Sequence, residues 1–384
     1  MSTRSKRIAI ANGGGYVPGL NAVVAGAARA AHELGWELVC IRDGFDGLLH
    51  PDRYAEGGLV RLSAEAVEHL SSAAAPVLGT GARTDPFHVR TVSAEQAVEE
   101  VDRSEDLLEA IRKEALEAVI AVVDTHALSV VYKLGRKGLK AVCVPKSAEN
   151  HIAATQLSFG FNSVLSFTVD MLDRARQAAE AARKLAVVEV LGEHAGWLAL
   201  QAGTAACADA TLIPEIPFDL TKVVEALRKK LQTGRHYGLI VAAEGAAAAA
   251  GHVAAALPAN PLRASLSPGA TGHEGGHVIE RSGHVAATVA VQLQRLIDQE
   301  IYPLALGPLV KAGAPTAVDR QLGLAYGAAA VRAIAENQAG VLVAFQPPAL
   351  KFVPLIEAIN KIRTVPGDSV FIQVARSLGI SLGD

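Results

Sequence analysis

The chain has 384 residues, half of them hydrophobic and 4% aromatic, and its formal net charge is −3 at pH 7. This length exceeds what one hydrophobic core usually supports, so we expect two lobes. Without a surplus of basic residues, nucleic acid is not expected as the main partner. No signal region and no uninterrupted membrane-spanning run is evident, so the sequence predicts a cytoplasmic protein without a membrane partner.

The first predicted strand, residues 8–11, leads into Gly13, Gly14 and Gly15 and then, after Gly19, into a helix. Glycines let the backbone approach an anion closely and adopt positive φ. The N-terminus of a helix adds free N–H groups and the positive end of its dipole. This order predicts a phosphate cradle, with a turn that needs glycine only for its shape as the alternative.

Further along, short apolar runs alternate with longer helical patterns, which favours an α/β fold with a mostly parallel sheet covered on both faces. Asp219 is the expected cap of one helix. The predicted strands are 37–41, 118–123, 140–144, 186–190, 210–213 and 238–242, and the predicted helices include 104–116, 167–184 and 220–232.

Two features point away from metal binding. Cys40, Cys143 and Cys207 are widely spaced in apolar runs, and this spacing predicts buried thiols in a reducing compartment. Residues 245–276 combine an alanine run with prolines and glycines, which predicts a long surface loop or an insertion. Histidines 252, 273 and 277 lie in or just beyond it, but their spacing fits no standard metal site.

Several segments in order resemble the phosphofructokinases, both the ATP-using and the pyrophosphate-using branches. Gly-Gly-Gly-x-x-Pro-Gly-Leu-Asn-Ala begins at Gly13, and Leu-Gly-Thr-Gly-Ala-Arg ends at Arg83. Pro-Lys-Ser-Ala-Glu-Asn-His begins at Pro145 and resembles the catalytic loop of that family. Val-Glu-Val-Leu-Gly-Glu begins at Val188. The resemblance extends over about residues 6–345.

This resemblance implies two Rossmann-like αβα lobes with a cleft between them. Residues 1–157 with about 315–365 would form the lobe that binds the phosphate donor, and residues 158–314 with about 366–384 the lobe of the sugar-phosphate type. It also implies ATP or pyrophosphate as the donor, Mg²⁺ as a metal, a phosphate-bearing small molecule as partner, and a homo-oligomer.

On the donor side, the resemblance assigns phosphate binding to Gly14, Gly15, Gly19, Arg83 and Lys146. Phosphoryl transfer needs neutralised charge and a carboxylate that accepts the proton of the attacking hydroxyl.

In the catalytic loop, Ser147 and Glu149 are the expected catalytic residues, although Glu149 is one methylene longer than the aspartate of the family. His151 replaces a second aspartate.

The expected metal loop departs from the family. Counting back from the catalytic loop puts Thr125 at the metal position, and a shift of one residue restores Asp124 as the metal ligand. The two glycines of the family turn are absent, and His126 is neither the glycine nor the aspartate that separates ATP users from pyrophosphate users. A cap at a strand end is the alternative for Asp124.

On the acceptor side, the resemblance assigns Lys184, Glu193, Glu244 and Lys311. Glu193 stands where the family has an arginine, which reverses the charge beside the expected substrate. Pro308 replaces a histidine and Tyr302 falls near an arginine position, and for these two we favour ordinary strand and turn packing. Fructose 6-phosphate is therefore not expected to bind in the familiar way.

Two functions remain open. One is a phosphotransferase with a changed acceptor and weak or lost 6-phosphofructokinase activity. The other is an inactive paralogue that acts as a regulatory or structural subunit, in an oligomer that could include an active paralogue. A dinucleotide-binding oxidoreductase is disfavoured because the glycines do not follow Gly-x-Gly-x-x-Gly, and Asp43 is the nearest acidic candidate after the second strand.

Overall fold

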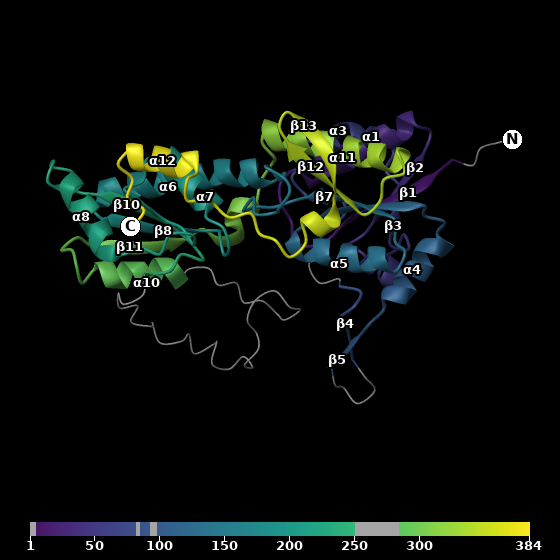
Figure 1. Cartoon of the computed structure of the whole chain (residues 1–384), viewed down its shortest axis with the longest axis horizontal. Coiled ribbons are helices and arrows are strands. Elements are labelled where there is room, and N and C mark those ends of the chain that lie inside the picture. Colours follow the sequence, from purple (N-terminus) through teal and green to yellow (C-terminus); the bar gives the residue numbers. More distant parts are fainter. Residues whose placement is uncertain (1–4, 82–84, 93–97, 250–283) are drawn as a thin grey trace. The chain divides into compact units, whose positions relative to one another are not determined.

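The computed structural model describes residues 5–81, 85–92, 98–249 and 284–384 (Figure 1). Its contacts divide the chain into two compact units. Unit 1 comprises Met1–Ser147, Ile152–Ser163 and Lys311–Lys361, and unit 2 comprises Ala148–His151, Val164–Val310 and Ile362–Asp384. Residues 250–276 of the expected surface loop, with the three histidines named above, lie outside the described residues.

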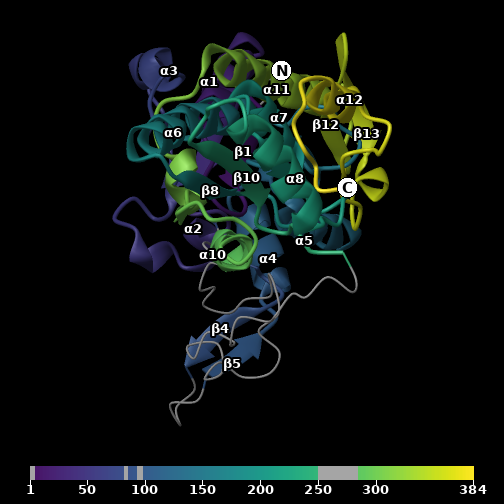
Figure 2. The ribbon, with the colours of Figure 1, turned by 90° about the vertical axis from the view of Figure 1, so that its left-hand side faces the viewer.

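Unit 1 is built on a seven-stranded sheet in the order β13-β12-β7-β6-β1-β2-β3. The strands from β12 to β2 are parallel, and β13 and β3 pair antiparallel at the two edges. A separate antiparallel ribbon, β4 with β5, extends from this unit beyond α4 (Figure 2). The bounds are β1 Arg7–Asn12, β2 Glu37–Ile41, β3 Leu59–Val60, β4 Val89–Val92, β5 Val98–Val101, β6 Ala118–Val123, β7 Ala141–Pro145, β12 Val341–Gln346 and β13 Ala349–Pro354.

Helices cover both faces of this sheet (Figure 1). One face of the sheet packs against α4 and α5. Each of these helices has an apolar side that is buried against the sheet, formed in α4 by Leu107, Leu108 and Ile111. The other face packs against α1 and α11. The bounds are α1 Leu20–Glu33, α2 Asp46–Leu49, α3 Ala64–Leu70, α4 Ser104–Lys113, α5 Thr125–Arg136 and α11 Ala317–Ala335, with 3-10 turns at Pro51–Arg53 and Leu355–Glu357.

Unit 2 is built on a four-stranded parallel sheet in the order β11-β8-β10-β9. Its core packs apolar side chains of α8 and α10 against one face of the sheet. The bounds are α6 Phe161–Ala182, β8 Leu185–Val190, α7 Trp197–Ala205, β9 Ala210–Leu212, α8 Leu220–Leu231, β10 Gly238–Ala243, α10 His284–Leu293, β11 Ile301–Ala305, a 3-10 turn at Gly307–Lys311, and α12 Val370–Ser377. No described helix is both long enough and apolar enough to cross a bilayer.

The predicted α/β fold with mostly parallel sheets is confirmed, and every strand predicted from the sequence is present within one or two residues. Asp219 caps α8 as expected, since its Oδ1 accepts the N–H of Thr221 at 2.8 Å. The prediction that all three cysteines are buried is wrong for Cys207, which is exposed. This residue lies just after α7 with φ of 49°, in a turn outside the core.

Glycines bring α1 and α11 into close contact. A Cβ added at Gly327 would lie 2.1 Å from the Val23 carbonyl oxygen, and one at Gly26 would lie 2.2 Å from the Leu324 carbonyl oxygen. Both obstacles are backbone atoms of the opposite helix, so no rotamer change relieves them. The distance between these two helices is therefore set by residues without side chains.

Replacing Gly327 with alanine should destabilise the chain by about 1–3 kcal/mol, because α1 and α11 must separate. The matched control is Gly135→Ala in α5, where an added Cβ meets nothing within 4 Å. That change should leave stability unaltered or raise it by up to about 1 kcal/mol. Urea unfolding of both variants tests this, and equal stabilities would contradict the packing argument.

Candidate functional site

The cradle lies at the carboxyl ends of three neighbouring strands of unit 1. The β1–α1 loop follows β1, Asp124 follows β6, and Lys146 follows β7. Val123 and Pro145 are partners in the parallel register of β6 and β7, so Asp124 and Lys146 are the next residues along adjacent strands. The N–H of Lys146 donates to the Val123 carbonyl at 2.9 Å. Ligands of open α/β sheets bind at such strand ends.

Lys146 is the buried cation of this cradle, with 1% of its surface exposed. Its Nζ donates to the Gly15 carbonyl at 2.5 Å and to Oδ1 of Asn12. Burial lowers the pKa of Lys146 to about 8, the charge of Asp124 opposes this shift, and the charge of Lys311 adds to it. The ammonium therefore depends on a few acceptors and on one nearby carboxylate.

Asp124 is the N-cap of α5, which was the alternative considered for it from the sequence. Its Oδ1 accepts the N–H of Ala127 at 2.9 Å. Its Oδ2 lies against the glycine loop, so closely that a Cβ on Gly14 would stand 1.8 Å from this oxygen. Gly14 has φ of +85°, which L side chains rarely adopt. Asp124 and Gly14 are thus brought together at one strand end.

The predicted donor residues occupy different surroundings. Gly15 is exposed, and nothing lies within 4 Å of the place where its Cβ would be. Gly19 is buried at the N-cap of α1, where an added Cβ would lie 3.2 Å from the ring of Phe159 and 3.4 Å from the Asp319 carbonyl oxygen. This position gives Gly19 a packing role instead of a surface for an anion. Arg83 lies outside the described residues.

Asp124 supplies one carboxylate at this strand end. Mg²⁺ is usually held in proteins by one or two carboxylates together with waters and substrate phosphates. His126 is half exposed, with Nε2 at 3.7 Å from Oδ2 of Asp85. Across the described residues, no group of three or more His, Cys, Asp or Glu is placed to hold a metal ion. The role of Asp124 as a metal ligand stays a prediction.

The expected catalytic loop is anchored at both ends. Ser147 is buried, and its N–H donates to the Phe159 carbonyl at 3.2 Å. Glu149 and His151 form a pair, with Oε2 and Nδ1 at 3.5 Å. Arg363 then fixes the loop, because its Nη1 donates to the Asn150 carbonyl at 3.0 Å and its N–H to the His151 carbonyl at 2.8 Å. The guanidinium of Arg363 also stacks over Trp197 at 4.0 Å.

Unit 2 carries two of the predicted acceptor residues together. Glu193 and Glu244 follow the parallel strands β8 and β10, and the two turns touch, since the N–H of Gly245 donates to the Gly192 carbonyl at 3.0 Å. A Cβ on Gly245 would lie 2.0 Å from the Glu193 carbonyl oxygen. This strand end therefore carries two carboxylates.

The other predicted acceptor residues lie elsewhere. Lys184 precedes β8 and pairs with Glu300, Nζ to Oε2 at 2.6 Å, so six strand residues separate it from the turn of Glu193. At about 3.3 Å per residue this is about 20 Å. Lys311 ends a 3-10 turn, and its charge acts on Lys146 in unit 1.

Of the two positions for which packing was favoured, Tyr302 donates its hydroxyl to the Ala175 carbonyl at 2.8 Å, and Pro308 lies in the same turn as Lys311.

Two residues of the site were not singled out from the sequence. Asn12, the last residue of β1, is completely buried and holds Lys146 through Oδ1, while its amide donates to the Gly79 carbonyl at 2.9 Å. The sequence did offer a signal for Asn12, because it is a polar residue at the end of an apolar strand, directly before the glycines. Arg363 gave no such signal, because it is more than 200 residues from the loop that it anchors.

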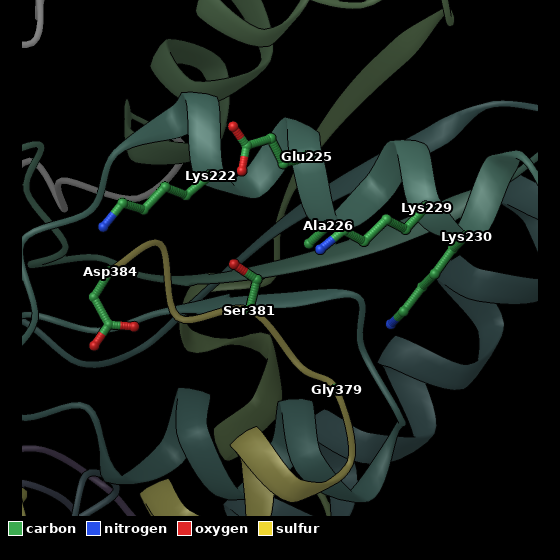
Figure 3. Close-up of a pocket in the computed structure, with 8 residues that line it drawn as sticks. All are labelled: Lys222, Glu225, Ala226, Lys229, Lys230, Gly379, Ser381 and Asp384. Carbon is green, nitrogen blue, oxygen red and sulfur yellow. The ribbon is translucent and has the colours of Figure 1, made fainter.

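A separate hollow of about 420 Å³ opens in unit 2 between α8 and the C-terminal segment (Figure 3). Three lysines face two carboxylates there, and two of these groups are already paired: Lys230 with the buried Asp209 at 3.0 Å, and Asp384 with Arg376. The lining residues are Lys222, Glu225, Ala226, Lys229, Lys230, Gly379, Ser381 and Asp384. None of them belongs to the predicted site.

Comparison with known proteins agrees with the fold. Residues 7–334 match the model of the family described as Phosphofructokinase. The chain belongs to the phosphofructokinase family. An ATP-dependent 6-phosphofructokinase of Chloroflexus aurantiacus is 34% identical over 384 residues, which is 100% of this chain and 99% of that protein.

A second relative carries another donor in its name. A pyrophosphate–fructose 6-phosphate 1-phosphotransferase of Amycolatopsis methanolica is 34% identical over 363 residues, 94% of this chain and 96% of that protein. Among solved structures, a pyrophosphate-dependent phosphofructokinase from Nitrosospira multiformis superposes with a TM-score of 0.73 at 19% identity, covering 98% of this chain and 92% of that one. The shared fold is thus that of the family.

The pKa of Lys146 predicts how stability depends on pH. Between about pH 8 and 10.5 an unfolded lysine still holds its proton while the folded one releases it, so in this window the unfolded state binds more protons. Stability from this group therefore rises with pH across the window. In urea unfolding, the free energy of unfolding of the wild type should increase relative to that of Lys146→Met from about pH 8 upward. Below about pH 7 the difference between the two proteins should be constant. Lys113→Met, at an exposed lysine, is the control. If the difference in free energy of unfolding between the wild type and Lys146→Met did not change with pH, the lowered pKa of Lys146 would be contradicted.

Proposed function

We propose that this chain is a phosphotransferase of the phosphofructokinase type that takes its phosphoryl group from ATP or pyrophosphate, with weak or lost activity on fructose 6-phosphate. Names of relatives support the reaction class, since they include both ATP-dependent and pyrophosphate-dependent enzymes. The glycine loop with Lys146 supports the donor side. Its backbone and its ammonium are the groups that recognise phosphate in other proteins.

One observation carries the proposed change of acceptor: Glu193, which stands where the resemblance expects an arginine, follows the carboxyl end of β8 in a turn that touches the turn of Glu244. A sugar phosphate is a dianion near neutral pH, and a carboxylate in place of an arginine repels it. Each lost charge-assisted hydrogen bond is worth about 1.5–3 kcal/mol. An acceptor with less negative charge than a phosphate monoester fits this end of the sheet better.

The predicted role of Lys184 at the acceptor requires a homo-oligomer. Its side chain stands at the amino end of β8, so it reaches a ligand beside Glu193 only from a second copy of the chain. The same lysine is held by Glu300 within its own chain.

A second candidate function is that of a non-catalytic subunit. It is favoured by the pairing of Glu149, the expected base, with His151, in a loop that Arg363 anchors. A paired carboxylate is a weaker proton acceptor than one positioned on the substrate.

Radiolabelled transfer assays distinguish these functions. With Mg²⁺ and either donor, turnover of fructose 6-phosphate should be negligible, because the acceptor end is acidic, while a panel of other sugars and sugar phosphates should yield a product. On that acceptor, Glu149→Gln should reduce the rate roughly 10²-fold or more, the usual contribution of a general base. The exposed Glu105→Gln should have no effect. Robust turnover of fructose 6-phosphate would contradict the lost activity, and donor binding without any product would favour the non-catalytic subunit.

A further inference from the structure

A short segment of the expected catalytic loop is fastened to unit 2. The contacts of the chain assign Ala148–His151 to this unit, although the residues directly before and after this segment belong to unit 1. Glu149, the expected base, lies within the segment. Whatever fastens these four residues to unit 2 therefore also places Glu149 in that unit.

Arg363 makes two of the fastening contacts. Its Nη1 donates to the Asn150 carbonyl at 3.0 Å, and its backbone N–H donates to the His151 carbonyl at 2.8 Å. Asn150 directly follows Glu149 and has φ of 55°, a conformation that persists where surrounding contacts hold it. Hydrogen bonds to two consecutive carbonyls fix both the position and the direction of the backbone beside Glu149.

Trp197 in turn fixes Arg363. The guanidinium lies 4.0 Å over the indole ring, and the indole N–H donates to the Arg363 carbonyl at 2.8 Å. Trp197 is buried, and its ring meets that of Phe371 edge-on with the centroids 6.3 Å apart. A planar guanidinium that is stacked on a fixed ring presents its donors in one direction. Arg363 is thus preorganised for the Asn150 carbonyl.

The stretch of chain that carries Arg363 is also tied to the turn of Glu193. Oε1 of Glu215 accepts the N–H of Val365 at 2.8 Å and the N–H of Gly196 at 3.0 Å. Val365 is two residues after Arg363, and Gly196 is three residues after Glu193. The expected base and the predicted acceptor turn therefore depend on one short stretch of chain, through hydrogen bonds that all lie within unit 2.

We propose that Arg363 is a positioning residue, which sets the place of Glu149 relative to the turn of Glu193. The inference rests on the proposed function in taking Glu149 as the base and this turn as part of the acceptor site. A general base acts only within hydrogen-bond reach of the proton that it removes. A misplacement of about 1 Å can cost about 10²-fold in rate, so the loop that carries the base needs firm support.

The first experiment needs no ligand. Arg363→Met removes the guanidinium donors and keeps an unbranched side chain against Trp197. Loss of the charge-assisted hydrogen bond should accelerate backbone hydrogen exchange in peptides covering residues 148–151 by about tenfold or more, measured by mass spectrometry. Arg174→Met is the matched control, since Arg174 is 69% exposed and pairs with Asp170 on the same helix. Unaltered exchange in residues 148–151 would overturn the inference, and so would equal acceleration throughout unit 2, because it indicates a general structural role.

The second experiment tests the link to the acceptor turn. Glu215→Ala removes the acceptor of the Val365 and Gly196 N–H groups and leaves Arg363 unchanged. If the base and the turn depend on the same stretch of chain, exchange in residues 148–151 should again accelerate. Glu215→Gln keeps an acceptor oxygen and should have a smaller effect. Exchange in residues 148–151 that does not respond to Glu215→Ala would contradict the link.

The third experiment asks whether Arg363 acts through Glu149. With radiolabelled ATP or pyrophosphate and the sugar or sugar phosphate that yields a product, Arg363→Met should lower kcat by about tenfold or more and leave the KM for the donor unchanged. In a Glu149→Gln background the same replacement should have little further effect, because the base is already absent. Reductions of kcat that multiply independently would count against a positioning role.

The outcomes separate the inference from the proposed function. If no acceptor yields a product, the proposed function fails, and hydrogen exchange alone decides whether Arg363 holds the segment of Glu149. If a product forms while Arg363→Met changes neither exchange nor kcat, the proposed function stands and the inference is overturned. Faster exchange confined to residues 148–151, together with a non-additive kinetic cycle, supports both.

Discussion

The candidate site depends on the burial of one ammonium group. An isolated charge is costly to remove from water, so Lys146 must find acceptors inside the unit. The structure supplies the Asn12 amide oxygen and the Gly15 carbonyl, and Asp124 provides the nearby negative charge. Because one of these acceptors is a backbone atom of the glycine loop, the lysine holds that loop in shape.

Packing of α1 against α11 holds the same loop from the other side. Gly26, Gly323 and Gly327 allow the two backbones to approach, and the N-cap of α1, Gly19, is buried against Phe159 and Asp319. The loop between β1 and α1 is thus fixed at its start by the sheet and at its end by a helix that cannot shift. Because the backbone of this loop is held at both ends, differences in the chemistry of the site come from side chains such as Asp124.

Most of the fold could be predicted from the sequence, because the buried strands are short apolar runs such as those of β6 and β7. Strands β11 and β13 were not predicted, since Pro303 and Lys351 interrupt their apolar pattern. Strand β12 was missed although Val341–Gln346 is mostly apolar. The cap at Asp219 was predicted, because capping is local and needs only neighbouring residues.

The site was less predictable. From the sequence, Asp124 was predicted as a metal ligand or a cap, and its contact with Gly14 was not predicted, because it depends on the register of β6 against β1 and on the start of α5. Within one chain the predicted acceptor residues are not all close together, because Lys184 and Glu193 lie at opposite ends of β8. Resemblance assigns a residue to a position in a motif. It does not show whether that residue lies at the same strand end as the rest of the site in one copy of the chain.

Carboxylates lie at strand ends in both units. In unit 1 Asp124 lies against the glycine loop, and in unit 2 Glu193 and Glu244 follow β8 and β10. By resemblance, Glu244 matches a carboxylate that holds the sugar hydroxyls in the family, whereas Glu193 stands where the family has an arginine. The proposed change of acceptor therefore depends on Glu193 in unit 2, and it leaves the proposed donor side of unit 1 unaltered.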